Sequence, residues 1–201
     1  MRKFVVATKN KGKLLEIAEI LKELPFEIVS MEELGITKEI EEYGITFEQN
    51  AIIKAREIFD ITREMVMADD SGLEVDFLNG APGIFSARFA GVGATDSNKN
   101  NKLLELLKGV PFEKRSARFV CVIAVVLSDG SHFTVRGTCE GFIGFEAVGN
   151  NGFGYDPLFF LKEYNQTTAQ MQPEEKHRIS HRGKALKAMV QKLETILLEI
   201  P

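Results

Sequence analysis

The chain has 201 residues, of which 44% are hydrophobic and 27% charged, as is ordinary for a globular protein that buries its own core. Its formal net charge of −4 excludes a general attraction to nucleic acid or to an anionic membrane, so any bound anion must be held by local basic groups. No apolar run approaches the roughly 20 residues that a membrane span needs.

Strands and helices alternate at the start of the chain. Residues 4–7 are predicted to form a buried strand, a helix starts at Lys13 and stops at Pro25, and residues 26–30 form a second strand. The apolar residues of this helix share one face: Leu14, Ile17, Ala18, Leu21 and Leu24.

A second helix is predicted after an acidic loop. The stretch from Thr46 to Gln49 resembles a capping box, and the helix that it opens runs to about Arg63. The predicted buried face comprises Phe47, Ala51, Ala55, Ile58 and Phe59. The later elements are, in order, a strand at 65–68, loops at 76–95, a helix capped by Asp96 that runs to Leu107, a hairpin of 118–127 and 131–138, a strand at 158–161, a polar segment to Lys176 and a helix from about Ser180.

This order of elements predicts an α/β fold. Strands that alternate with helices indicate parallel crossovers, and the hairpin adds antiparallel strands. We expect a central mixed sheet flanked by helices, in a single domain of residues 1–201 whose two lobes leave a cleft between them.

The two cysteines, Cys121 and Cys139, are predicted to be core thiols. A two-residue loop at Asp129-Gly130 would place them on opposite sides of the pleat, which disfavours a disulfide. Free thiols, together with an N-terminus too soon polar for a signal peptide, indicate a cytoplasmic protein.

The loop Thr8 to Lys13, "TKNKGK", lies between a strand and a helix. Such a loop aims backbone N–H groups and the helix dipole at a bound anion, and Lys9, Lys11 and Lys13 add charge. It is not a Walker loop, because the G-x-x-x-x-G-K-[ST] pattern is absent. The alternative is a solvated lysine turn.

Asp69 and Asp70 follow the 65–68 strand, at the end where open α/β sheets place ligands. Neighbouring side chains on an extended chain point opposite ways, so one carboxylate can serve structure while the other faces a ligand. Magnesium prefers one or two carboxylates plus phosphate oxygens. The alternative is a plain Asx turn with Ser71 and Gly72.

The acidic loop before the second helix offers Glu41 and Glu42 as further metal ligands. Asn50 and Lys54 are four residues apart and share a face of that helix. The alternative is a solvated surface.

The stretch "SHRGKAL" starts the last helix against the usual preferences. His181 and Arg182 put positive charge at a helix N-terminus, and Gly183 weakens the same turn. Such conflicts are typical of functional sites, although a poorly optimised helix start is the alternative. Phe153, held between two glycines, could stack on a base or fill the core.

Five stretches occur in an order and at spacings that resemble the inosine triphosphate pyrophosphatase family: "ATKNKGKLLEI", "TFEQNAIIKA", "ADDSGLEVDFLNGAPGIFSARFAG", "GNNGFGYDPLF" and "EEKHRISHRGKAL". The resemblance extends from about Arg2 to the last helix. It implies hydrolysis of ITP, dITP and XTP to the monophosphate and pyrophosphate with Mg²⁺, by a two-lobed homodimer.

The resemblance also implies roles for individual residues. The metal ligands would be Glu41 and Asp70, and Asp70 would also accept the proton of the attacking water. Thr8, Asn10 and Lys13 would hold the triphosphate, Lys54 would be a further phosphate contact, and Ser71 would touch substrate. The residues around the base would be Phe153, Gly154, Tyr155, Asp156, Lys176, His181 and Arg182. Lys9, Lys11 and Gly12 are added to the substrate-binding set by the anion-binding interpretation of their loop.

Selectivity for these bases has a physical reason. Hypoxanthine and xanthine carry an acceptor oxygen where adenine carries an amino donor. Lys176, His181 and Arg182 all donate, and an unpaired buried polar group costs about 1–3 kcal/mol. Two alternatives remain open: a Maf-like pyrophosphatase of other base preference, and a nucleotide-binding module without turnover. Glu41 and Asp70 argue against the second, because a binding module needs no carboxylate to activate water.

Overall fold

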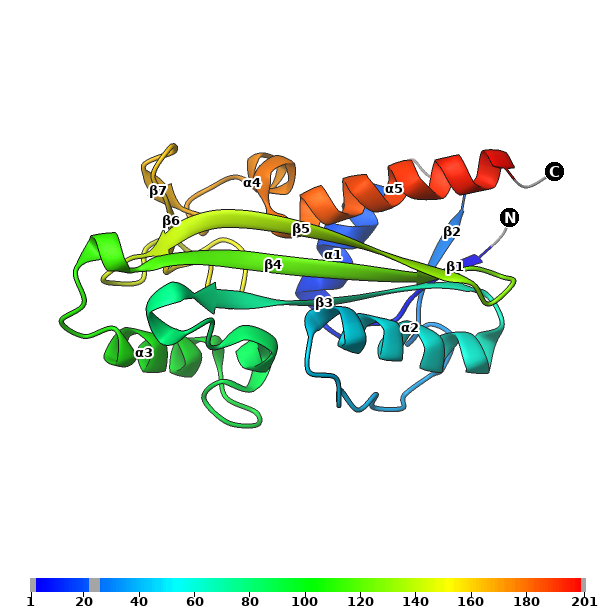
Figure 1. The fold of residues 1–201 in the computed structure, drawn as a ribbon, viewed down its shortest axis with the longest axis horizontal. Coiled ribbons are helices and arrows are strands. Elements are labelled where there is room, and N and C mark those ends of the chain that lie inside the picture. Colours follow the sequence, from blue (N-terminus) through cyan, green and yellow to red (C-terminus); the bar gives the residue numbers. More distant parts are fainter. Residues whose placement is uncertain (1–2, 22–25, 200–201) are drawn as a thin grey trace. The chain divides into compact units, whose positions relative to one another are not determined.

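The computed structural model describes residues 3–21 and 26–199, and within them it has one seven-stranded sheet (Figure 1). The strand order is β2-β1-β3-β4-β5-β6-β7. The strands are β1 (Lys3–Val6), β2 (Glu27–Ser30), β3 (Met65–Val75), β4 (Ser116–Val126), β5 (His132–Ile143), β6 (Phe159–Leu161) and β7 (Gln166–Thr167). Because β1 is parallel to β2 and β3 while β6 is antiparallel to β5 and β7, the predicted mixed α/β sheet is confirmed.

The helices are α1 (Lys11–Leu21), α2 (Phe47–Thr62), α3 (Asp96–Leu106), α4 (Pro173–Ile179) and α5 (His181–Glu199). Helix α1 begins two residues before the predicted Lys13, while the predicted Leu24 and Pro25 lie outside the described residues. Helix α4 occupies part of the segment that was expected to be irregular. Its N-terminal proline, two early glutamates and three late basic residues are all favourable helix-end signals.

The chain divides into two compact units. The first contains Met1–Asp70, Cys121–Gly137 and Arg182–Pro201, and the second contains Ser71–Val120 and Thr138–His181. The expected single two-lobed domain stays a prediction.

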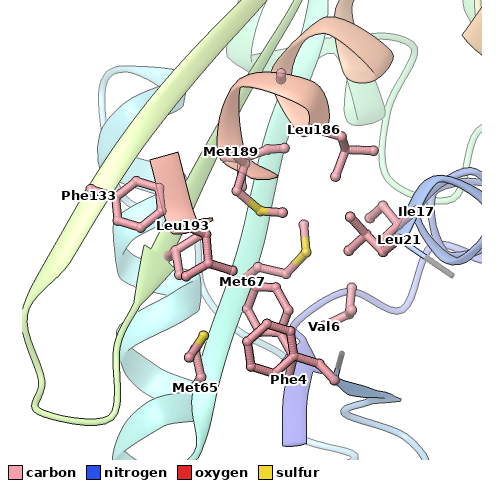
Figure 2. Packing of buried hydrophobic residues seen from close by; sticks show 14 of the residues in the cluster. Phe4, Val6, Ile17, Leu21, Met65, Met67, Phe133, Leu186, Met189 and Leu193 are labelled. Atoms are coloured by element: carbon pink, nitrogen blue, oxygen red, sulfur yellow. The ribbon is translucent and has the colours of Figure 1, made fainter. Parts of the chain in front are cut away.

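The core of the first unit lies between its strands and the helices α1 and α5. Figure 2 shows Ile17 of α1 and Met189 of α5 beside Phe4 and Met67 from the strands. Residues of the opposite pleat face, such as Val66, are equally buried, and α2 covers that face (Figure 1). The predicted buried face of α2 is confirmed in full: Phe47, Ala51, Ala55, Ile58 and Phe59.

Helix caps agree with the sequence only in part. Thr46 caps α2 as predicted, with its hydroxyl accepting from the backbone N–H of Gln49 at 3.1 Å. The Gln49 side chain accepts from the N–H of Ile45, one residue before the expected partner. Helix α3 is capped by Thr95 rather than Asp96, because the threonine forms a reciprocal box with Asn98.

The second unit has its own apolar core. Helix α3 contributes Leu103, and Leu107 follows it, both fully buried. They pack with residues of the strands and of the segment before β6, including Leu73, Phe119, Ile143, Leu158 and Phe159. Aromatic rings also contact one another within this core, with the tilted rings of Phe119 and Phe159 having centroids 4.3 Å apart.

Two predictions about the strands were wrong. Strand β3 does not end at Ala68 but continues through both aspartates to Val75, which also excludes an Asx turn at Ser71. In the β4–β5 turn three residues, not two, lie between the paired Leu127 and Ser131, since the Leu127 N–H donates to the carbonyl of Ser131; Gly130 adopts φ +83° there.

The two-residue register used to place the cysteines was therefore wrong, yet both cysteines are buried and form no disulfide within the described residues, as predicted. Among the described residues, no helix is long and apolar enough to cross a bilayer.

Candidate active site

The adjacent carboxylates of β3 point to opposite faces of the sheet, as the extended chain predicts. Asp69 shares the face of Met65 and Met67, toward α1 and α5, whereas Asp70 faces α2. The parallel pairing of β1 with β3 ends at Met67, so both aspartates lie just beyond it. Asp69 and Asp70 therefore have separate sets of partners.

Asp69 is the centre of a buried ion network. Its Oδ2 lies 2.9 Å from the Lys13 ammonium and 3.5 Å from a guanidinium nitrogen of Arg182, which also pairs with Glu16. Asp69 and Arg182 are each 2% exposed. Burial alone would raise the pKa of Asp69, but the charges of Lys13 and Arg182 outweigh burial and hold that pKa well below its ordinary value. Asp69 is thus an ionised counter-ion within the fold.

The ion network of Asp69 explains why a cation is tolerated at the start of α5. Arg182 is in the first turn of that helix, where a cation is disfavoured, but two carboxylates surround it. Burial would lower the pKa of Arg182, and the charge of Asp69 reverses that effect and raises the pKa. The negative charges that offset this cation are therefore side chains of the chain itself.

The Thr8 to Lys13 loop is an ordered helix start. The Asn10 side chain accepts from the Lys13 N–H at 3.1 Å, and the Asn10 N–H donates to the Thr8 hydroxyl at 3.2 Å. Lys9 donates to the carbonyl of Thr37 at 2.5 Å. Lys11 is exposed, and Gly12 lies in the first turn of α1. The loop presents a helix N-terminus with lysines around it, and anion binding there stays a prediction.

Asp70 is held by α2. Its two oxygens accept from Lys54 Nζ at 3.1 Å and from Asn50 Nδ2 at 3.2 Å, and Lys54 also donates to Glu42 at 2.8 Å. The other end of the Asn50 amide accepts from the N–H of Gly44 and so fixes the acidic loop. Burial, and then the charge of Glu42, raise the pKa of Asp70 although Lys54 acts against them.

Asp70 of β3 and Glu42 of the acidic loop bring two carboxylates together beside Lys54 of α2. The carboxylates of Asp70 and Glu42 both lie within 3.1 Å of the Lys54 nitrogen, so they flank a small volume that already holds a positive charge. Glu41, the predicted ligand, is exposed. Among the described residues, no group of three or more His, Cys, Asp or Glu is placed to hold a metal. A cation bound through one or two carboxylates, with phosphate oxygens completing its shell, agrees with this set.

In the second unit, Asp156 organises the glycine-rich stretch. One of its oxygens accepts from the Phe153 N–H at 2.8 Å and from Lys176 Nζ at 2.7 Å, and the other accepts from the Thr168 hydroxyl at 2.8 Å. The Lys176 nitrogen lies 5.4 Å from the centre of the Phe153 ring. A buried ammonium and a half-buried aromatic ring are thereby brought together, as a base-binding role requires.

The remaining predicted residues of the second unit are placed as follows. Tyr155 is buried and donates its hydroxyl to the carbonyl of Ser86 at 2.9 Å. The ring of His181 stacks on Phe119, with centroids 4.8 Å apart. Ser71 is half-buried in β3, directly after Asp70. Each is ordered within the fold.

Two partners of candidate site residues, Glu16 and Thr168, were not found by sequence reasoning. Glu16 is 166 residues from Arg182 in the chain, and Thr168 is 12 from Asp156, so neither contact leaves a local pattern. The preference for Glu42 over Glu41 beside Lys54 depends on how the loop is folded. Only the helical spacing of Asn50 and Lys54 gave a usable signal.

Known proteins resemble this chain over nearly its full length. Residues 4–192 match the Ham1 family. A dITP/XTP pyrophosphatase of Desulforamulus reducens is 52% identical over 98% of this chain and 98% of that protein, and one of Clostridium perfringens is 49% identical over 98% and 100%. Among solved structures, a HAM1 protein from Coxiella burnetii (43% identity, TM-score 0.86) covers 99% of this chain and 100% of its own. The Staphylococcus aureus Ham1 protein (39%, TM-score 0.87) covers 96% and 99%.

Proposed function

Because this chain belongs to the Ham1 family, we propose that it hydrolyses the non-canonical purine nucleoside triphosphates ITP, dITP and XTP to the monophosphate and pyrophosphate. The observation that carries the proposal is the buried Asp70 held by Lys54 and Asn50, in a chain about half identical to dITP/XTP pyrophosphatases over nearly its full length.

The first unit would handle the triphosphate. Cleavage between the α- and β-phosphates builds negative charge on the departing pyrophosphate, and Lys13 and Lys54 would stabilise that charge. The loop Thr8 to Gly12 would add backbone donors and lysine charge. Asp70 would orient the attacking water and take its proton, and the pKa raised by burial makes its carboxylate a better base.

We further propose that Mg²⁺ is bound by Asp70 and a glutamate of the acidic loop, with Glu41 as the ligand that the motif resemblance implies. When bound, magnesium would polarise phosphate oxygens and neutralise part of the developing charge. Glu42, which forms an ion pair with Lys54, is the alternative second carboxylate ligand of Mg²⁺. Either glutamate would offer carboxylate oxygens, so separate variants of Glu41 and Glu42 decide between them.

The second unit would recognise the base. Phe153 would stack on the purine, and Lys176 and His181 would donate to the oxygen at the six position, while Ser71 would contact substrate. Arg182 belongs to this set by its motif, but its guanidinium is held by Glu16 and Asp69. We therefore expect Arg182 to stabilise the ionised Asp69, in addition to any contact that it makes with the base.

Three further properties belong to the proposal. We expect a single two-lobed domain over residues 1–201, a homodimer and a cytoplasmic location, in which the enzyme would keep deaminated purines out of nucleic acid. The two buried free thiols are consistent with a reducing compartment.

A nucleotide panel tests the proposed function. The protein is incubated with Mg²⁺ and with ITP, XTP, GTP, ATP or dTTP, and monophosphate and pyrophosphate are measured separately. Turnover confined to ITP and XTP supports the proposal. A preference for dTTP would select a Maf-like activity instead, and tight binding without product would select a binding module.

A further inference from the structure

The start of α3 holds the backbone of the glycine-rich stretch Gly152 to Asp156, here called the Phe153 loop. The Gly154 N–H donates to Asp96 at 2.7 Å, and the side-chain amide of Asn100 donates to the Gly154 carbonyl at 3.0 Å. Asp96 and Asn100 are four residues apart and therefore lie on one face of the helix. Both polar groups of Gly154 are thus bound by the same helix.

Helix α3 is a rigid support for these two bonds. Its N-terminus is closed by the reciprocal box of Thr95 and Asn98, and its next turn is anchored in the core by Leu103. Asn100 is only 6% exposed, although asparagine is a weak helix former. The amide oxygen of Asn100 has no hydrogen-bond partner within the described residues. The bond that its NH2 group donates to Gly154 is therefore the interaction that accounts for an asparagine at this buried position.

The other residues of the Phe153 loop are fixed as well. The Phe153 N–H donates to Asp156, and the Tyr155 hydroxyl donates to Ser86. Gly152 and Gly154 both adopt left-handed backbone angles, with φ of +76° and +64°. A Cβ on Gly152 would lie 2.1 Å from an oxygen of Asp156. The backbone that carries the Phe153 ring is therefore held on both sides of that ring.

We propose that Asp96 and Asn100 are positioning residues for base recognition: by clamping Gly154 they hold the Phe153 ring where it stacks on the purine. This inference rests on the proposed function, because it takes Phe153 as the residue that contacts the base. It adds α3, a helix with no residue in the candidate site, to the elements that determine how the base is bound.

The chain contains no tryptophan, which gives a direct readout of the loop. A Phe153→Trp background carries a single indole on the loop, and acrylamide quenching reports its exposure without any nucleotide. Adding Asn100→Leu or Asp96→Ala should raise the quenching constant about twofold or more. Two controls should leave it unchanged: Asp96→Asn keeps an oxygen acceptor for Gly154, and Lys99→Met removes only the ion pair of Lys99 with Asp96. Unchanged quenching in both clamp variants overturns the proposal.

Kinetics with natural Phe153 test the link to the base. Loss of one clamp bond should raise KM for ITP about tenfold with a much smaller change in kcat, because the base lies away from the reacting phosphorus. This rise in KM for ITP should occur in Asn100→Leu and Asp96→Ala but not in Lys99→Met. A KM for ITP that stays constant while quenching rises contradicts the role in base recognition.

The two readouts keep the inference separate from the proposed function. A wild-type protein that does not hydrolyse ITP contradicts the proposed function and with it the role at the base, whereas the tryptophan reporter still shows whether α3 holds the loop. Circular dichroism confirms that each variant is folded. If Asn100→Leu fails to fold, Asp96→Ala against Asp96→Asn decides the question.

Discussion

Replacing Asp69 by asparagine should destabilise the fold, whereas the same change at Asp70 should not. Asp69 is buried between Lys13 and Arg182, which it neutralises. Asp69→Asn keeps the size of the side chain but leaves two cations in a buried setting with less negative charge. Asp70 lies on the other face of the same strand, where Lys54 retains Glu42 as a partner.

The size of the Asp69 effect follows from its burial. Removing one partner of a buried ion pair costs about 3–5 kcal/mol of unfolding free energy. Each kcal/mol lowers Tm by roughly 2–4 °C in a protein of this length, so Asp69→Asn should lower Tm by roughly 6–20 °C. Thermal and urea unfolding at pH 7, followed by circular dichroism, measure both quantities.

The difference in unfolding free energy between wild type and Asp69→Asn should also depend on pH. Burial would raise the pKa of Asp69, but Lys13 and Arg182 lower it below its ordinary value. Such a carboxyl contributes stability that is present above its unfolded pKa of about 3.9 and is lost as the pH falls toward its folded pKa. The gap in unfolding free energy between wild type and Asp69→Asn should therefore be full at pH 7 and should narrow below about pH 4.

Asp70→Asn is the matched control. Burial and Glu42 raise the pKa of Asp70, so its ionised form is less favourable in the folded protein than in the unfolded chain. A neutral amide should leave the unfolding free energy unchanged or slightly higher. Equal losses of Tm in the two variants, or an Asp69→Asn protein as stable as wild type, would refute the division of roles between the two carboxylates.

Three other outcomes are expected. Asp70→Asn should abolish turnover of ITP while the Kd for nucleotide changes little, as measured by calorimetry; residual turnover above about 1% would argue against a general base. Removing metal with a chelator should stop turnover, and of Glu41→Gln and Glu42→Gln the variant of the true ligand should need about tenfold more Mg²⁺ for half-maximal rate. Burial, and then Asp69, raise the pKa of the Cys121 thiol to about 12, so native protein at pH 8 should not react with a thiol-specific disulfide reagent, whereas urea-unfolded protein should; rapid labelling of native protein would contradict this burial.

Apolar periodicity predicts most of the elements because it depends on neighbours within one helix or strand. The buried face of α2 and its Thr46 cap follow from spacing alone. Strand β3 runs longer than its apolar residues because distant cations neutralise Asp69 and Asp70, and no local pattern contains that information. The charges that usually end a buried strand are here part of it.

The candidate site shows the same division. The spacing of Asn50 and Lys54 on one helical face predicts that they act together, and both bind Asp70. The partner of Arg182 could not be predicted, since Glu16 lies at the other end of the chain. Helix α4 was missed because it lacks apolar periodicity, although Pro173 at its first turn was a readable start signal.

The proposed chemistry, attack of water on the α-phosphorus with Asp70 as proton acceptor, is tested most directly by isotope position. ITP is hydrolysed in water enriched in ¹⁸O, and both products are examined by mass spectrometry. The proposal predicts one ¹⁸O atom in inosine monophosphate and none in pyrophosphate. Label in pyrophosphate, or release of inorganic phosphate and a diphosphate instead, would contradict it.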